Sequence, residues 1–179
     1  MSSKRSALTF LLPILLVAFI IQSCGDNSTN FREIEYTPPE PYDINNAVSD
    51  STTEDGLTIY VIEEGYGKSG VVSRDQLRVR YTGRTEDGEV FESTYRNGNS
   101  TPGILRNLTP NPMTSPQGRR INPLVDGFRR GLLGMVEGEK RKLIIPPELG
   151  YGTVDEEPAE GSLENKTLYF DVELVEILN

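Results

Sequence analysis

Apolar and polar side chains alternate with a period of two in several stretches of the chain, which is the pattern of a strand with one buried face. The alternation covers residues 57–62, 77–82 and 168–174, and it is most regular in the last of these. A further strand is predicted at 140–145, and it stops at two consecutive prolines, where a hydrogen-bonded ladder cannot continue. These four segments are therefore predicted to be strands.

A single short segment has helical spacing instead. Phe128, Leu132 and Met135 recur every three or four residues, and Asp126 precedes them as a candidate N-cap. Many strands with one short helix predict an antiparallel α+β domain, in which the helix packs on one face of the sheet.

The N-terminal segment has the layout of a targeting sequence. An apolar block from 7 to 21 follows Lys4 and Arg5, and it is shorter than the ~20 residues that a membrane-spanning helix needs. The block runs into the sequence IQSC, whose last residue, Cys24, is the only cysteine. This ending resembles the lipobox of bacterial lipoproteins, in which the signal peptide is removed and the cysteine carries the lipid.

We therefore expect residues 1–23 to be a lipoprotein signal peptide and Cys24 to attach the exported chain to a membrane of the bacterial cell envelope. An uncleaved N-terminal anchor and an ordinary secretory signal cut elsewhere are the alternatives. The polar, proline-bearing stretch that follows predicts a flexible tether over 24–51, although 31–36 could also form a strand or dock on the domain. Residues 52–179 are expected to form one domain.

Composition narrows the chemistry that this domain can perform. The chain has no histidine and one cysteine, which excludes Ser-His-Asp and Cys-His nucleophiles, an intramolecular disulfide and thiolate metal clusters. Its formal net charge of −9 argues against binding nucleic acid through a general positive field. Hydroxyls, carboxylates, backbone amides and apolar surface are left to carry the function.

Five segments carry a more specific pattern. They are VRYTG at 79–83, DGEVFES at 87–93, the stretch from LVDGF to GL at 124–132, the stretch from GEKR to LGYG at 138–152, and FDVEL at 170–174. In this order they resemble the FKBP-type peptidyl-prolyl cis-trans isomerases, over residues 55–179. The resemblance implies an α+β fold with a twisted antiparallel β-sheet wrapped around one short α-helix. It also implies an isomerase without a cofactor or metal that binds proline-containing protein segments, with macrolide inhibitors as further ligands.

Isomerisation of this kind suits a chain without histidine. The barrier of ~20 kcal/mol to rotation about an X-Pro bond arises from amide resonance, which is lost as the bond twists. A twisted amide is less charge-separated than a planar one, so a dry aromatic pocket can favour it by differential binding. No nucleophile or proton shuttle is required.

The resemblance assigns four aromatic side chains to a proline pocket. Tyr81 and Phe91 would line it, Phe128 would form its floor, and Phe170 its far wall. Without the resemblance, the same residues would be interpreted as ordinary core, because aromatic side chains on strands and amphipathic helices are usually buried.

Four further positions complete the implied site. Leu124 would belong to its hydrophobic rim, and Val125 would offer its backbone N–H to a substrate carbonyl, since amides at a helix N-terminus lack partners. The Tyr151 hydroxyl would be directed at the carbonyl of the residue before proline. Glu92 would accept a hydrogen bond from Tyr81.

The sequence departs from the family pattern in four places. Phe128 stands where tryptophan is usual, and Glu92 stands where aspartate is usual. The loop 153–163 is polar and acidic where the family tends to have aliphatic residues over the pocket. The segment 97–120 is longer than usual, and long loops of this kind are often functional.

These departures leave three functions open. The first is a lipid-anchored isomerase for exported proteins, and the second is a non-catalytic proline-segment binding or chaperone module of a membrane-associated assembly, for example in motility or secretion. The third is a structural envelope lipoprotein. Two basic pairs, Arg119-Arg120 and Arg129-Arg130, are either a basic patch or an ordinary solvated face.

Overall fold

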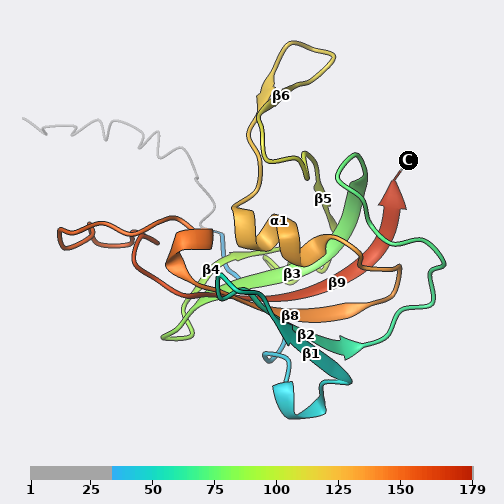
Figure 1. Ribbon diagram of the computed structural model, residues 1–179, viewed down its shortest axis with the longest axis horizontal. Helices are drawn as coiled ribbons and strands as arrows, with labels where there is room; N and C mark the ends of the chain where they lie inside the picture. Colours follow the sequence, from blue (N-terminus) through green and yellow to red (C-terminus); the bar gives the residue numbers. More distant parts are fainter. Residues whose placement is uncertain (1–33, 179) are drawn as a thin grey trace, which may run out of the picture. The chain divides into compact units, whose positions relative to one another are not determined.

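The computed structural model describes residues 34–178 of the chain (Figure 1). The expected signal peptide and Cys24 lie outside the described residues. Among residues 34–178, no helix has the length and apolar character that crossing a membrane requires.

In chain order the elements are η1 (Ile44–Asn46), β1 (Ser49–Thr52), β2 (Thr58–Glu63), β3 (Gln76–Thr85), β4 (Val90–Ser93), β5 (Gly103–Leu105), β6 (Met113–Thr114), β7 (Arg120–Ile121), α1 (Asp126–Leu132), β8 (Lys140–Ile145), η2 (Pro147–Leu149) and β9 (Leu168–Leu178).

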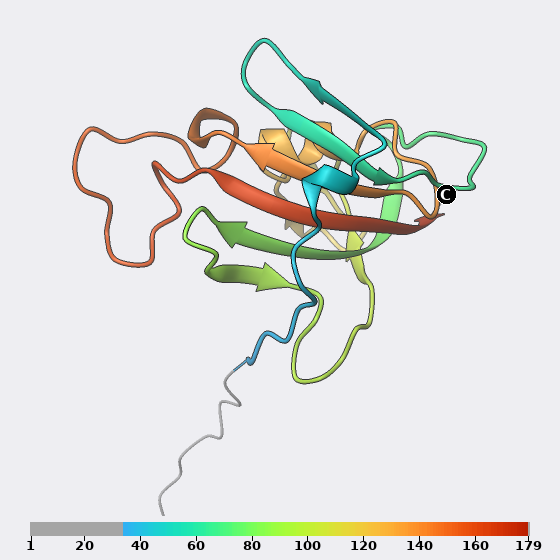
Figure 2. The same cartoon turned by 90° about the horizontal axis from the view of Figure 1, so that it is seen from below.

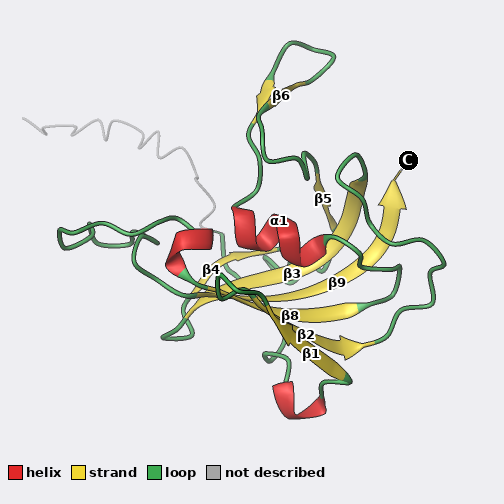
Figure 3. Ribbon diagram, viewed as in Figure 1, coloured by secondary structure: helices red, strands yellow, loops and turns green. Residues whose placement is uncertain are grey.

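A seven-stranded antiparallel sheet forms the body of the fold (Figure 3). The strand order is β1-β2-β8-β9-β3-β4. β5 also pairs with β3, at residues 77–79, whereas β4 pairs with residues 82–84. The central pairing of β3 with β9 runs from Gln76 opposite Leu178 to Thr85 opposite Leu168. The helix α1 lies across one face of this sheet (Figure 1). The α+β fold predicted from the sequence is therefore confirmed.

All four predicted strands are present. β8 has the predicted bounds, and β2 begins and ends one residue later than predicted. β3 extends three residues beyond the predicted end, and in this part of the strand every residue from Tyr81 to Thr85 is buried. The alternation ends there because both faces of the central strand are covered, so periodicity no longer marks the strand.

The helix differs from its prediction at both ends. Val125 occupies the N-cap, and Asp126 is the first helical residue; its carboxylate bonds Arg129 and Arg130 rather than a backbone amide. Met135 lies beyond the helix but is fully buried. Glycines at two helical positions allow close packing on β8, since a Cβ at Gly131 would stand 2.5 Å from Leu143 Cδ1.

Residues 34–51 differ from the expected tether, because they pack on the sheet. β1 pairs with β2, and Thr37 N–H donates to the Tyr95 carbonyl at 3.0 Å. Arg84 and Lys142 donate to backbone carbonyls of this segment, at Pro39 and Tyr42 respectively. Figure 2 shows the segment crossing the face of the sheet opposite to α1. The long-range partners hold an extended, proline-bearing chain in place.

Candidate active site

Four aromatic side chains from four elements contact one another where α1 meets the sheet. Phe128 of α1 stacks on Phe170 of β9 with 4.2 Å between ring centroids, and Phe91 of β4 meets Phe170 edge-on at 5.5 Å. The ring of Tyr81 on β3 lies 5.5 Å from Phe128 and 6.2 Å from Phe170. The fold thus brings together all four aromatic residues that the sequence named, and we call them the aromatic cluster.

The cluster is closed on the sheet side by Gly83, which sequence reasoning did not single out. Gly83 pairs with Phe170 across the β3–β9 ladder. A Cβ at this position would stand 2.6 Å from Phe91 Cζ and 2.8 Å from Phe170 Cε1. Only glycine leaves both rings where they are, and its place at the end of the VRYTG motif is the signal that could have found it.

Tyr81 carries the one polar group within the aromatic cluster. The Tyr81 hydroxyl donates to Glu92 Oε1 at 2.5 Å, and the Tyr81 backbone N–H donates to Thr94 Oγ1 at 3.0 Å. Burial raises the pKa of Tyr81 far above its ordinary value, and the hydrogen bond to Glu92 raises it further. The phenol is therefore held as a neutral donor whose direction is set by an exposed carboxylate.

Tyr151 is 49% exposed and lies near enough to Glu92 to interact with its charge. It follows the short helix η2, whose turn is closed by bonds from the Gly150 and Gly152 amides to the Pro147 carbonyl. Burial raises the pKa of Tyr151, and the charge of Glu92 raises it further. The hydroxyl of Tyr151 thus stays protonated and shares the field of the carboxylate that holds Tyr81.

Leu124 and Val125 approach the cluster from the segment before α1. Both are half-buried and pack against the core that includes Phe128. The Val125 carbonyl accepts from Arg129 N, whereas the Val125 N–H donates no hydrogen bond to any group in residues 34–178. An N-cap amide without a partner can bond an incoming carbonyl.

The loop 153–163 follows Tyr151 in the chain and projects away from the sheet (Figure 1). Its base is tied by Asn165, a second residue that sequence reasoning missed. The Asn165 side chain accepts from Val154 N at 2.7 Å and donates to Val154 O at 2.9 Å, and its backbone has φ 60°. Asparagine tolerates this left-handed conformation better than most residues, which makes it suited to the position.

The arrangement offers apolar ring faces, two neutral phenols that interact with Glu92 and an unpaired backbone amide. Within the described part of the chain, no three Asp, Glu or Cys side chains gather closely enough to hold a metal ion. Such a set of groups can bind an apolar ring and orient the carbonyl groups of a peptide around it.

Comparison with known proteins agrees with this geometry. A family model described as FKBP-type peptidyl-prolyl cis-trans isomerase matches residues 67–175. The chain is 33% identical over 126 residues to the FKBP-type peptidyl-prolyl cis-trans isomerase FkpA of Escherichia coli, a match that covers 70% of this chain and 39% of FkpA. It is 38% identical over 105 residues to FK506-binding protein 2 of Dictyostelium discoideum, covering 59% of this chain and 67% of that protein.

A solved structure shows the same relationship in three dimensions. The crystal structure of FkpA from Escherichia coli superposes with a TM-score of 0.55 and 32% identity, over 72% of this chain and 51% of that one. The chain thus spans about two fifths of the full length of FkpA in sequence. Because the family model covers more than half of the chain and the fold and the order of motifs agree with it, the chain belongs to the family of FKBP-type peptidyl-prolyl cis-trans isomerases.

Proposed function

We propose that the chain catalyses cis-trans isomerisation of X-Pro bonds, with the proline ring bound against the aromatic cluster. The observation that carries the proposal is the convergence of Tyr81, Phe91, Phe128 and Phe170 on one site in a chain of this family. Aromatic side chains offer large apolar faces with little conformational entropy to lose, which suits them to bind a proline ring.

Catalysis would come from differential binding of the twisted amide. Rotation removes resonance from the X-Pro bond, so a site that is poor in water favours the twisted form over the planar ground state. Each 1.4 kcal/mol of such preference is worth a factor of about ten in rate. The reaction breaks no covalent bond and moves no proton.

The polar groups would orient the peptide. We assign the Tyr151 hydroxyl to the carbonyl of the residue before proline, and the Val125 N–H to a carbonyl on the following side. Glu92 would act through Tyr81, since its carboxylate sets the direction of that phenol. Leu124 would shield the rim from water. The exposed hydroxyl of Tyr151 and the unpaired amide of Val125 support these roles.

The direct test is cis-trans relaxation of a Leu-Pro tetrapeptide with the purified chain. We expect relaxation to become faster in proportion to protein concentration, and Phe128→Ala to remove most of the acceleration. A rate equal to that of buffer, with a protein shown to be folded by circular dichroism, would overturn the proposal. Binding of the peptide without acceleration would favour the binding-module alternative.

We also propose that the chain is a lipoprotein of the bacterial cell envelope, acting on exported proteins. The sequence supports this proposal: two basic residues precede a short apolar block, and the block is followed by a lipobox-like IQSC that contains the only cysteine. Labelled palmitate should be incorporated into the chain in a bacterial host and not into Cys24→Ala. Incorporation that survives this substitution would reject Cys24 as the attachment site.

A further inference from the structure

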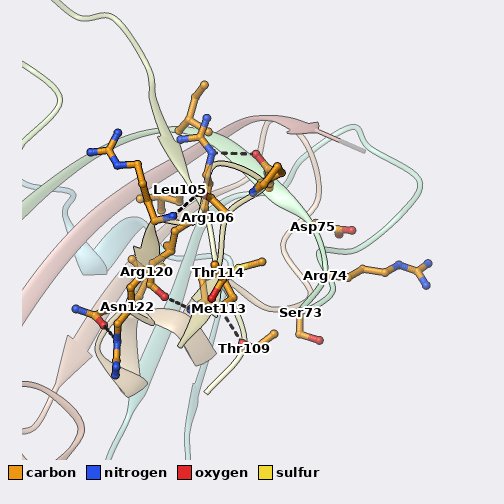
Figure 4. A pocket seen from close by; sticks show the side chains of 18 of the residues that line it. Ser73, Arg74, Asp75, Leu105, Arg106, Thr109, Met113, Thr114, Arg120 and Asn122 are labelled. Carbon is orange, nitrogen blue, oxygen red and sulfur yellow. Dashed lines mark hydrogen bonds between the residues drawn. The ribbon is translucent and has the colours of Figure 1, made fainter. Parts of the chain in front are cut away.

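A concave site lies beside β5, outside the aromatic cluster. It is a cavity of about 910 Å³ between β5 and the hairpin of β6 and β7, and Leu124 forms part of its wall (Figure 4). We call it the arginine groove, because its lining includes Arg106, Arg119, Arg120 and Arg74, the last with its side chain extending away from the others (Figure 4).

The arginines of the groove exceed its carboxylates, since Asp75 is the one acidic residue in the lining. None of its four arginines forms a salt bridge within residues 34–178. Arg106 Nε donates to the neutral Gln76 Oε1, and Arg120 Nε to the neutral Asn122 Oδ1, each at 3.1 Å. The carboxylate in the lining, Asp75, accepts from the backbone amide of Val72. In a chain with a net charge of −9, this is an unusual place to gather cations.

The basic pairs noted in the sequence therefore separate in the structure. Arg129 and Arg130 both bond Asp126, and Arg130 also pairs with Asp55. Arg119 and Arg120 instead join cations from the segments before β3 and after β5. The two pairs do not make one patch, and only the pair on the hairpin retains uncompensated charge.

Apolar side chains lie among the guanidinium groups. Ile104 and Met113 are 42% and 44% exposed, and Leu105 is buried beneath them in the wall of the groove. Exposed apolar surface next to several cations favours a peptide that carries both apolar and acidic side chains over a simple inorganic anion.

The hairpin that forms one wall is anchored rather than free. Asn107 is buried and donates from Nδ2 to the Asn111 carbonyl at 3.0 Å and to the Ile121 carbonyl at 3.1 Å. Its Oδ1 accepts from Thr109 Oγ1 at 2.6 Å. This one side chain ties the start and the end of the hairpin together, so the groove is present before any ligand binds.

The arginine groove and the proposed active site share one residue, Leu124. Leu124 lines the groove and directly precedes Val125, to which we assign the carbonyl on the side that follows proline. Tyr151, assigned to the carbonyl before proline, is not part of the groove lining. A peptide that leaves the proline site past Val125 therefore enters the groove.

We propose that the arginine groove binds the segment that follows proline in an extended polypeptide substrate and selects acidic side chains there. This inference rests on the proposed function, since it defines the substrate class of the same site. Each exposed ion pair contributes little alone, but several together with the apolar contacts give an expected preference of about tenfold.

The test is equilibrium binding of fluorescent peptides to the purified full chain, measured by anisotropy. One peptide carries Glu-Asp-Glu after Leu-Pro-Phe, a second carries the same acidic residues before it, and a third carries Gln-Asn-Gln after it. We expect the first to bind about tenfold more tightly than the other two at low salt, with the advantage reduced at 0.3 M salt. Arg119→Gln with Arg120→Gln should abolish the advantage.

A matched control removes the same charge elsewhere. Lys68 and Lys166 form no salt bridge within the described residues and lie outside the groove lining, so Lys68→Gln with Lys166→Gln should leave the preference unchanged. Equal affinities for the three peptides, or a preference that survives loss of Arg119 and Arg120, would overturn the proposal. So would binding of phosphatidylglycerol vesicles that depends on these arginines without any peptide preference, because it would assign the groove to lipid headgroups.

The proposed function is measured separately by turnover of an uncharged Leu-Pro tetrapeptide, which is too short to fill the groove. An acidic preference without turnover would support the proposal for the arginine groove and reject the proposed isomerase activity. Turnover without the preference would support the isomerase activity and reject the proposal for the groove.

Discussion

Gly83 is the residue at which the aromatic cluster has the least space for change. A methyl group there would stand 2.6 Å from the Phe91 ring and 2.8 Å from the Phe170 ring, so both must shift. We predict that Gly83→Ala lowers the free energy of unfolding by ~1–3 kcal/mol through overpacking. Urea denaturation measures this cost, and in a Phe91→Leu background the cost should be smaller, since the shorter side chain leaves space. Equal costs in the two backgrounds would contradict the packing argument.

Tyr151 tests the orientation of the peptide. Tyr151→Phe removes the hydroxyl and keeps the ring, and loss of one neutral hydrogen bond of ~0.5–1.5 kcal/mol should lower kcat/KM about two- to tenfold. Because burial and Glu92 raise the pKa of Tyr151 above its ordinary value of 10.0, the donor stays protonated and activity should be constant from pH 7 to 10. If kcat/KM of the parent chain fell between pH 7 and 10, and this fall were absent in Tyr151→Phe, the pKa of Tyr151 would be lower than we expect.

Single residues differ in how far the sequence can predict them. The four aromatic residues could be predicted to lie together because ordered motifs surround them, and the motifs carry more information than hydrophobicity does. Gly83 was not found, because its need for glycine arises from rings on β4 and β9 that only the folded sheet brings together. Asn107 was not found for the same reason, since the carbonyls that it bonds are 4 and 14 residues away.

At the scale of elements, a buried ion cluster holds the N-terminal segment on the sheet. Asp171 of β9 accepts from Arg84 at 2.7 Å and from Lys142 at 3.1 Å, and the three side chains are 10 to 11% exposed. The same two cations donate to the carbonyls of Pro39 and Tyr42. Two strands and the segment before η1 are therefore tied to one carboxylate.

This cluster gives a prediction about stability. Asp171→Asn leaves two buried cations without a counter-charge, and we expect the free energy of unfolding to fall by ~3–5 kcal/mol in urea denaturation. The control is Glu176→Gln, which removes a partner of Arg78 from a pair that is 44% and 47% exposed and should change stability by less than ~1 kcal/mol. Similar losses in the two variants would show that burial does not decide the value of these pairs.

The same cluster explains why the tether was predicted too long. Prolines and polar residues at 38–51 are typical of a free chain. The composition of this segment does not show that Arg84 and Lys142, which lie far along the sequence, donate hydrogen bonds to it. The strands could be predicted because alternation is local to each of them. Their order in the sheet could not be predicted from periodicity, because it depends on pairing between strands that are far apart in the sequence.

At the scale of the whole molecule, buried tyrosines make stability sensitive to alkaline pH. Burial raises the pKa of Tyr81 and of Tyr42 well above 10 in the folded chain, and nearby carboxylates add to it. Above pH 10 the unfolded chain loses these protons while the folded chain keeps them. The stability that they contribute is thus complete below pH 10 and falls above it, by at most ~1.4 kcal/mol per pH unit for each group.

We therefore predict that the free energy of unfolding, measured in urea at pH 9, 10 and 11, declines over the upper part of this range. Tyr42→Phe removes one titrating group and should make the decline shallower without changing the aromatic cluster. A decline of the same slope in this variant and in the parent chain would exclude Tyr42 as a cause.

The central claim is that the aromatic cluster is the site at which X-Pro bonds isomerise, and one titration tests it directly. The rate of cis-trans relaxation of a Leu-Pro tetrapeptide is measured with a fixed concentration of the chain while a macrolide that binds FKBP-type domains is added. The account predicts an acceleration that declines with added macrolide and vanishes when the sites are filled. Absence of acceleration at the start, or acceleration that persists at saturating macrolide, would contradict it.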